Sequence, residues 1–186
     1  MDYPVSRMTP RLTGALRLAL IPVAACSVAG AGLAASAAPS APGQGGGARS
    51  FDAVAFFTGN TTGEGMLKKM FSAAQVVRVT GRGRVEGGVL VLDQTVSITG
   101  EPSRERQWRL RAGAPGRWSG TLSDAKGPVL AQASGAVLTI AYTSDDGMGI
   151  TQTVTLAPDG NSARNRMKIR KLGMTVATID ETITRD

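Results

Sequence analysis

The residues that point most directly to binding chemistry are an arginine and a tryptophan on one predicted strand. Arg106, Trp108 and Leu110 alternate with more polar residues, and such alternation places them together on one strand face. A guanidinium on an apolar inner face needs a partner, because burying an unpaired charge is costly. The partner is either a carboxylate of the chain, Asp93 or Glu105, or the carboxylate or phosphate of a ligand. Arg106 is the first candidate for an anion-binding residue.

A second group of basic residues recurs at every other position, at Arg164, Arg166, Lys168 and Arg170. A strand would place these four on one face and Met167 on the other. Arg166 joins Arg106 as a candidate for binding the anion. The alternatives are a solvated outer stripe of little energetic weight, or a stripe that contacts an anionic membrane surface.

Large apolar side chains on several predicted strands are the candidates for the wall of the same site. They are Trp108, Trp118, Tyr142, Met148, Ile150 and Met167. Together with the two arginines they predict a pocket for an amphipathic anion, such as a fatty acid or the headgroup of a lipid.

Composition excludes several classes of chemistry. The sequence has no histidine, which excludes Ser-His-Asp triads and the common zinc sites. Its one cysteine, Cys26, lies in the N-terminal segment, so neither a metal nor another cofactor is predicted for the folded part. With two Trp and two Tyr there is no stacking platform beside the arginines, and no nucleic-acid partner is expected.

Two carboxylates keep an enzyme open as an alternative. Asp93 lies in the middle of a predicted strand, and Glu64 lies between two glycines. If both faced a barrel interior, the pKa of one would be raised and it could transfer a proton, as in a hydratase or isomerase. The simpler interpretation is that each pairs with a nearby arginine or faces water. We therefore expect a non-catalytic protein, with this enzyme as the alternative.

The elements that must position these residues are predicted to be strands. In residues 87–111, GGVLVLDQTVSITGEPSRERQWRLR, apolar side chains alternate on either side of a Thr-Gly-Glu-Pro-Ser turn. The stretch therefore predicts an antiparallel hairpin. Residues 51–57 are expected to plug or pack against a core. Residues 68–71 are expected to be a turn with one buried aromatic, Phe71.

The rest of the chain to residue 186 repeats this pattern of short strands and turns. About nine or ten strands with short connections predict an all-β protein, an antiparallel up-and-down β-barrel of calycin or lipocalin type. Closure of the barrel would remove its exposed edges. A small barrel is either filled by side chains or holds one ligand.

The N-terminal residues 1–37 have the composition of an export signal. Arg7, Arg11 and Arg17 accompany a small-residue apolar run, and Ala35-Ser36-Ala37 predicts cleavage before Ala38. The sequence around Cys26, Val-Ala-Ala-Cys, also resembles a bacterial lipobox, in which that cysteine would be acylated. We expect an exported protein in the periplasm, or one at the outer membrane if Cys26 carries lipid.

The other boundaries follow from composition and charge. Residues 38–50, rich in Gly, Pro and Ala, are expected to be a flexible linker, and 51–186 a single barrel domain. The formal net charge is +7 for the whole chain. Cleavage before Ala38 would leave 18 basic and 13 acidic residues, a net charge of +5. A basic protein at this location favours anionic lipids as partners.

An ordered succession of short motifs resembles the bacterial envelope family catalogued as domain of unknown function 3833. It runs through Phe56-Phe57-x-Gly59, Gly63-x-Gly65, Gly81, Leu90-x-Leu92-Asp93, Arg106-x-Trp108-x-Leu110, Trp118-x-Gly120, Gly127, Tyr142, Asn165-Arg166-Met167 and Lys171-Leu172-Gly173. The resemblance implies a lipocalin-like barrel without an established activity, in a family whose members are mostly exported proteins or lipoproteins. The resemblance also implies a lipid ligand, because the relatives are often encoded near lipid-modifying enzymes. The family more often has Glu at the position of Asp93, followed by an aromatic-rich strand that is missing here.

Together these observations predict an exported protein that binds or shuttles an amphipathic anion in its barrel. Two alternatives remain: the calycin-fold enzyme, and a structural or interaction module at the outer membrane.

Overall fold

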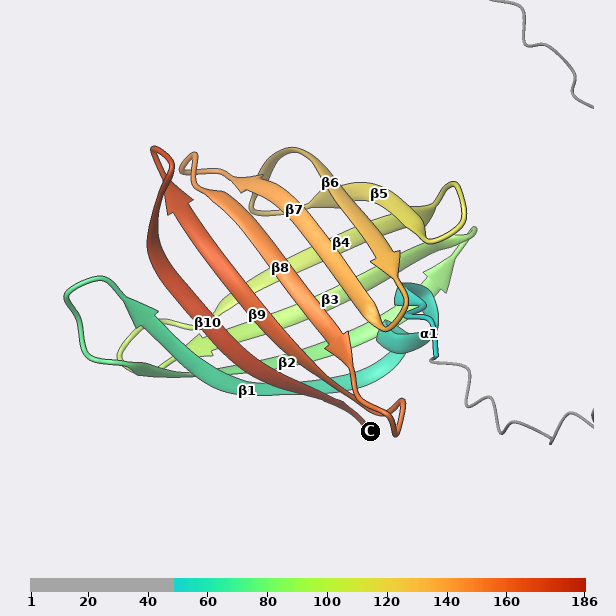
Figure 1. Ribbon diagram of the computed structural model, residues 1–186, viewed down its shortest axis with the longest axis horizontal. Coiled ribbons are helices and arrows are strands. Elements are labelled where there is room, and N and C mark those ends of the chain that lie inside the picture. Colours follow the sequence, from blue (N-terminus) through green and yellow to red (C-terminus); the bar gives the residue numbers. More distant parts are fainter. Residues whose placement is uncertain (1–48) are drawn as a thin grey trace, which may run out of the picture. The chain divides into compact units, whose positions relative to one another are not determined.

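The computed structural model describes residues 49–186, which form one short helix and ten β-strands (Figure 1). The helix, α1, spans Ala53–Phe57. The strands are β1 (Gly59–Lys69), β2 (Gln75–Glu86), β3 (Val89–Ile98), β4 (Arg104–Ala112), β5 (Arg117–Leu122), β6 (Ala125–Ser134), β7 (Val137–Ser144), β8 (Gly149–Leu156), β9 (Ser162–Lys171) and β10 (Met174–Arg185). The predicted export signal and residues 38–48 of the predicted linker lie outside the described residues.

The ten strands form a closed antiparallel barrel (Figure 1). Each strand pairs with its neighbours in sequence, and β1 pairs with β10 from Thr61↔Arg185 to Lys69↔Ala177 to complete the ring. Closure satisfies the backbone groups that an open sheet would leave at its edges. The prediction of an all-β, up-and-down barrel is confirmed, and β3 and β4 form the predicted hairpin with Leu92 opposite Trp108.

Alternation along each strand separates the interior of the barrel from its outer face. In β9 the buried residues Ala163, Asn165 and Met167 alternate with the exposed residues Arg164 and Arg166. The buried apolar side chains form two clusters. The larger cluster includes Phe56, Trp118 and Leu138, and the smaller consists of Leu67, Val77, Val79, Val96, Ile98 and Ala177.

Helix α1 closes one end of the barrel. The Asp52 carboxylate caps it by accepting hydrogen bonds from the backbone N–H groups of Val54 (2.9 Å) and Ala55 (3.1 Å). The rings of Phe56 and Phe57 pack edge to face with centroids 5.0 Å apart, and both are buried in the larger cluster. The segment therefore packs against the core as predicted. Its five residues are too few to show a helical period in the sequence.

A glycine on β2 allows this plug to sit close to the barrel wall. A Cβ atom at Gly83 would overlap the carbonyl oxygen of Phe57. Only a residue without a side chain lets the strand and the end of the helix approach so closely.

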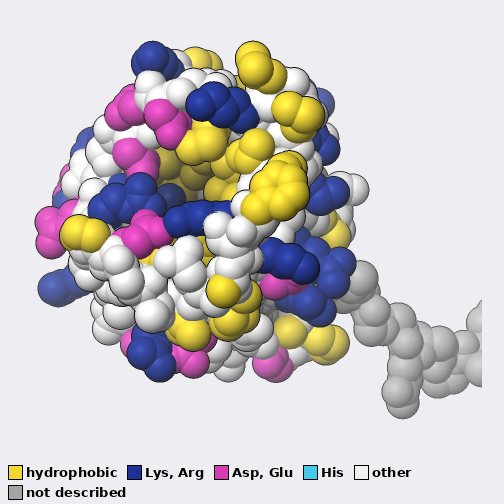
Figure 2. Space-filling view, turned by 90° about the vertical axis from the view of Figure 1, so that its left-hand side faces the viewer, with side chains coloured by type: hydrophobic (Ala, Val, Ile, Leu, Met, Phe, Trp, Pro, Cys, Tyr) yellow, Lys and Arg dark blue, Asp and Glu magenta, His cyan; other side chains and the backbone are white. Residues whose placement is uncertain are grey.

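The opposite end of the barrel is open, and we call it the mouth. The β1–β2, β3–β4, β5–β6, β7–β8 and β9–β10 turns surround it, as the alternating strand directions require. Figure 2 looks toward this end and shows hydrophobic side chains gathered in and around a hollow.

The β1–β2 turn at the mouth differs from its prediction. Phe71 was expected to be buried, but it is 99% exposed. Leu67 is the last buried side chain of β1, and the chain then passes beyond the rim before it turns at Phe71, whose φ is 61°. The side chain of Phe71 therefore has no core within reach.

No helix among residues 49–186 has the length and apolar character needed to cross a bilayer.

Candidate functional site

The mouth contains a cavity of about 370 Å³. One wall of this cavity is apolar and consists of residues of the smaller core cluster, Val77, Val79, Val96 and Ile98. The facing wall includes Tyr142, Met148, Ile150, Met167, Ile169 and Ile179. Charged side chains line the cavity as well, those of Arg104, Asp124, Asp145 and Asp146. This volume lies within the roughly 300–1,000 Å³ that small-molecule sites occupy.

The half of the barrel next to α1 is almost filled by side chains. Its inner cavity has a volume of only about 40 Å³, which is room for a water molecule or two. Val79, Arg106 and Glu181 line both this cavity and the mouth. These three residues therefore form the floor of the mouth.

Arg106 lies at the floor, on the inner face of β4, where alternation with Trp108 and Leu110 predicted it. Its Nε donates a hydrogen bond to Gln94 Oε1 (3.0 Å), which also accepts one from Trp108 Nε1 (2.7 Å). The guanidinium carbon lies 5.4 Å from the centroid of the Trp108 ring, a cation–π distance.

The expected carboxylate partner of Arg106 is not Asp93 or Glu105. Within residues 49–186, no ion pair includes Arg106. An amide oxygen and an aromatic face orient the guanidinium without neutralising it. Its remaining N–H donors can therefore serve an anion in the mouth.

Glu181 on β10 is the acidic residue of the floor, and the sequence analysis missed it. It is 7% exposed, and its Oε2 accepts a hydrogen bond from Asn165 Nδ2 (3.0 Å). Burial raises the pKa of Glu181, while the Asn165 hydrogen bond and the charge of Arg106 act in the opposite direction. The alternation of Ile179, Glu181 and Ile183 was the sequence signal that could have found it.

Gly63 on β1 makes room for this carboxylate. A Cβ atom at Gly63 would overlap Glu181 Oε1. The glycine at position 63 therefore leaves the space in the barrel wall that the Glu181 side chain occupies.

A row of polar side chains continues from Glu181 across the interior. Asn165 Nδ2 also donates to Gln152 Oε1 (3.3 Å), and Gln152 Nε2 reaches the Tyr142 hydroxyl at 3.5 Å. Burial raises the pKa of Tyr142, and its ring packs edge to face against Trp108 with centroids 5.5 Å apart. Among residues 49–186, Asn165 Oδ1 is buried without a hydrogen-bond partner. The inner cavity that Asn165 and Arg106 both line therefore contains an unused acceptor.

The predicted wall residues divide between the two halves of the barrel. Tyr142, Met148, Ile150 and Met167 all line the mouth. Trp108 is buried just below it and lines the inner cavity. Trp118 is placed differently, because it lines neither the mouth nor the inner cavity. Its buried side chain contributes to the packing of the larger core cluster.

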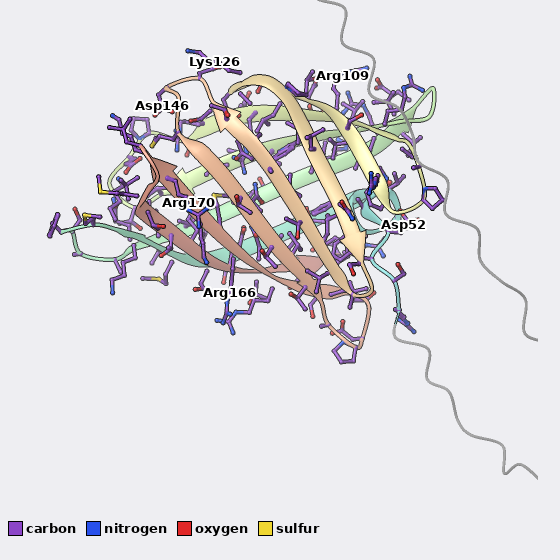
Figure 3. All side chains as sticks on the ribbon, turned by 45° about the horizontal axis from the view of Figure 1, so that its top comes forward. Asp52, Arg109, Lys126, Asp146, Arg166 and Arg170 are labelled. Atoms are coloured by element: carbon purple, nitrogen blue, oxygen red, sulfur yellow. The ribbon has the colours of Figure 1, made fainter. Side chains whose placement is uncertain are left out.

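The candidate Arg166 faces away from the interior. Its side chain is exposed on the outer face of β9 and lies 3.2 Å from Asp180 Oδ1, which also pairs with Arg164 at 3.0 Å. Figure 3 shows Arg166 and Arg170 projecting from the outside of the barrel. Successive side chains of a strand point to opposite faces of the sheet, so Arg166 and Met167 cannot both line one cavity. Asn165 and Met167 are the interior residues of β9.

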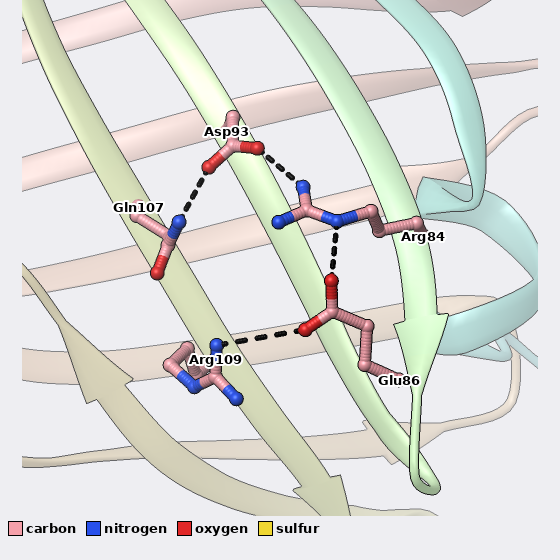
Figure 4. Close-up of polar contacts among 5 residues, drawn as sticks. All are labelled: Arg84, Glu86, Asp93, Gln107 and Arg109. Atoms are coloured by element: carbon pink, nitrogen blue, oxygen red, sulfur yellow. Dashed lines mark hydrogen bonds and ion pairs between the residues drawn. The ribbon is translucent and has the colours of Figure 1, made fainter.

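The two acids of the enzyme alternative are also outside. Asp93 accepts hydrogen bonds from Arg84 and from Gln107 Nε2 (2.7 Å) on the outer face. The network continues from Arg84 to Glu86 and Arg109 (Figure 4). Hydrogen bonds to Glu86 and Asp93 raise the pKa of Arg84. Hydrogen bonds from Gln107 and Arg84 lower the pKa of Asp93.

Glu64 is likewise exposed and pairs with Arg78 at 3.2 Å. Neither Asp93 nor Glu64 faces the mouth. Each pairs with an arginine on the outer face, as in the simpler of the two interpretations, and the alternative of an acid pair in the interior does not hold for these residues.

A larger depression of about 640 Å³ lies over β1 to β4. Its lining is mostly polar and includes Asn60, Thr62, Thr80, Arg82 and Asp93. It is open to water and offers no apolar wall. Arg106 lines this depression too, but only the mouth places it beside an apolar wall. The mouth is therefore the better candidate site.

Comparisons with known proteins agree with this architecture. The family described as "Protein of unknown function (DUF3833)" matches residues 32–185. Among solved structures, the S-type phycobiliprotein lyase CPES from Guillardia theta is similar with a TM-score of 0.55 and 7% sequence identity, covering 72% of this chain and 90% of its own. At that identity the likeness shows the fold alone. A search of curated proteins finds no match.

Proposed function

The chain belongs to the DUF3833 family of proteins of unknown function, and we propose that its barrel carries a small amphipathic anion, with a fatty acid as the model ligand. The observation behind this proposal is Arg106, which lies at the floor of a largely apolar mouth and forms no ion pair with a carboxylate of residues 49–186. An acyl chain would lie against the Val and Ile side chains of the wall. Its carboxylate would reach the Arg106 guanidinium.

Glu181 shapes the same proposal. An ionised glutamate beside Arg106 would repel a ligand anion, whereas a protonated one donates a hydrogen bond to it. Because the pKa of Glu181 is raised by burial, this carboxyl stays protonated to a higher pH than an ordinary glutamate. The floor would then offer two kinds of donor to one anion.

The test is calorimetric titration of the purified chain with dodecanoate, compared with dodecanol as an uncharged ligand of equal length. We expect Arg106→Ala to weaken dodecanoate binding by about tenfold to a hundredfold, because hydrogen bonds to charged groups contribute roughly 1.5–3 kcal/mol. Dodecanol binding should change little. Arg166→Ala is the matched control, since that arginine lies on the outer face. Equal losses in both arginine variants would contradict the proposal.

The location of the protein is a separate proposal. We infer export from the arginines and the apolar run of residues 1–37. The mass of the N-terminus after expression in a Gram-negative host tests it. Cleavage before Ala38 gives a free periplasmic protein, and a diacylated Cys26 gives an anchored one. An intact N-terminus would contradict both.

The basic stripe on β9 supports a second candidate, an interaction module at an anionic surface. Arg164, Arg166, Lys168 and Arg170 are all exposed on one face, although two of them share Asp180. If the stripe is the interface, binding to anionic vesicles should weaken with salt and fall in Lys168→Gln and Arg170→Gln.

A further inference from the structure

Two loops beside the mouth expose large apolar side chains that nothing in residues 49–186 covers. We call them the rim loops: the β1–β2 connection, residues 70–74, and the β9–β10 turn, residues 172–173. Phe71 is 99% exposed and Leu172 is 92% exposed at their tips. Met70 and Met174, at 47% and 62%, flank them. An apolar group of this kind marks an interaction surface rather than ordinary scatter.

The two rim loops are neighbours. β1 pairs with β10, and the backbone N–H of Met70 donates a hydrogen bond to the Val176 carbonyl at 2.9 Å. Apolar side chains continue onto the adjoining outer face, where Met66 lies opposite Val76 in the β1–β2 register. The exposed apolar surface therefore belongs to one sector of the rim.

The backbone presents both tips outward. Phe71 and Leu172 have φ angles of 61° and 50°, a region in which bulky side chains are rarely found because of steric strain. Both are the single bulky residue at the tip of their turn. A polar residue or glycine would fit these positions with less strain, so the apolar side chains are not explained by the fold.

The charge of this sector is positive. Residues 68–76 and 170–176 contain Lys68, Lys69, Arg170 and Lys171 and no acidic residue. Lys69 is paired with Glu101 at 2.5 Å. The other three form no ion pair within residues 49–186. Cations beside exposed apolar side chains fit an anionic lipid surface, since the apolar groups enter the interface and the cations meet the headgroups.

The part of the rim next to the β9–β10 turn has the opposite character, since β8 pairs with β9. Asp124 lies in the β5–β6 turn, and Asp145 and Asp146 lie in the β7–β8 turn. Figure 2 shows hydrophobic side chains on one side of the hollow and acidic side chains on the other. An anionic surface would attract one sector and repel the other, which fixes the orientation of the barrel.

We propose that the rim loops dock the mouth onto an anionic phospholipid bilayer, with Phe71 and Leu172 inserted among the headgroups. The proposal rests on the proposed carrier function and adds the source of its ligand: an amphipathic anion would pass between the bilayer and the mouth without crossing bulk water. The docking surface is the rim sector of β1, β2, β9 and β10, not the stripe along β9.

The test places a tryptophan at each tip and measures its quenching by brominated lipids. Phe71→Trp and Leu172→Trp are compared with Leu130→Trp, since Leu130 is 57% exposed on β6. Vesicles of phosphatidylglycerol and phosphatidylethanolamine are compared with vesicles of phosphatidylcholine alone. All variants carry Cys26→Ser, so that the first 48 residues contribute equally. The native Trp108 and Trp118 are buried and give a constant background.

We expect strong quenching of both tip tryptophans in the anionic vesicles and little at position 130. Vesicle binding should fall about tenfold or more in the double variant Phe71→Ser/Leu172→Ser, since each tip loses an apolar side chain from the interface. Leu130→Ser should bind as the unmodified chain does. Tip tryptophans that stay unquenched on vesicle-bound protein would overturn the proposal. A dimer in light scattering that is lost in Phe71→Ser/Leu172→Ser would also overturn it, because the rim loops would then be a dimer interface.

A second measurement separates this proposal from the carrier function. Phe71→Ser/Leu172→Ser should keep its affinity for dissolved dodecanoate but extract fatty acid from vesicles more slowly. Arg106→Ala should dock to vesicles normally while losing affinity for dodecanoate. Normal docking without any dodecanoate binding by the unmodified chain would overturn the carrier function alone.

Discussion

The chemistry of the mouth depends on a few residues whose surroundings set their charge. Arg106 keeps its charge free because Gln94 and Trp108 orient it without neutralising it. Glu181 lies in the barrel wall beside Asn165 and in the field of Arg106, where burial raises its pKa. One floor thus combines a permanent cation with an acid that loses its proton reluctantly.

The raised pKa of Glu181 predicts how stability depends on pH. The folded state holds this proton more tightly than the unfolded chain does, so the contribution is full below the ordinary glutamate pKa of about 4.3. It is lost as pH rises through the raised value. We expect the unmodified chain to lose stability relative to Glu181→Gln, which cannot titrate, over the pH range that begins at about 4.3 and extends upward through the raised pKa. Urea unfolding across this range measures the difference.

The control for this prediction is Glu64→Gln, which removes an exposed carboxylate from the outer face. Its stability should follow the unmodified chain across the same pH range. If the stability of Glu181→Gln also changed with pH as that of the unmodified chain does, the prediction for Glu181 would be contradicted.

At the scale of elements, helix α1 and the wall of the barrel are fitted to each other. The plug depends on the Asp52 cap, the packed phenylalanines and the missing side chain at Gly83. These features make one end of the barrel solid, so that the open cavity is confined to the mouth.

Gly83→Ala should therefore destabilise the protein by about 1–3 kcal/mol, the usual cost of forcing atoms into a packed site. The new Cβ would overlap the Phe57 carbonyl and displace the end of α1. Chemical denaturation measures the loss. Gly149→Ala is the matched control, because nothing lies near a Cβ there and its φ is not positive. Similar stabilities for the two variants would contradict the close fit of α1 and β2.

At the scale of the whole molecule, the sequence predicted the barrel better than its site. Alternation and turn residues are local signals, and the β3–β4 hairpin and the closed meander follow from them. The position of a residue along a strand is also needed to locate a site. Trp118 points inward as Tyr142 does, yet it belongs to the solid half of the barrel.

The missed residues have a shared cause. Glu181 enters the interior only because Gly63, far away in sequence, leaves space across the β1–β10 pair. Phe71 stays outside because β1 passes the rim before it turns. Both outcomes depend on the closure of the ring rather than on the composition of either segment.

Closure also predicts that the order of the strands can be cut and rejoined. A short Gly/Ser linker from Asp186 to Arg49, with new ends in the β7–β8 turn at residues 145–147, preserves every strand pair. We expect this permuted chain to fold to the same structure, since exposed turns tolerate new termini. Near-ultraviolet circular dichroism and urea unfolding test this expectation. A cut between Asp93 and Gln94, inside β3, should prevent cooperative folding. Equal behaviour of the two cuts would contradict the account of the ring.

The number of strands has one more consequence. Because ten is even, a meander returns to the side from which it started. Arg49 contacts the Asp159 carbonyl in the β8–β9 turn, and the last residue, Asp186, bonds to Asn60 at the start of β1. The chain thus enters and leaves the barrel beside its plug. Affinity tags, fluorescent proteins or surface tethers fused after Asp186 would attach behind the barrel and leave its opening unobstructed.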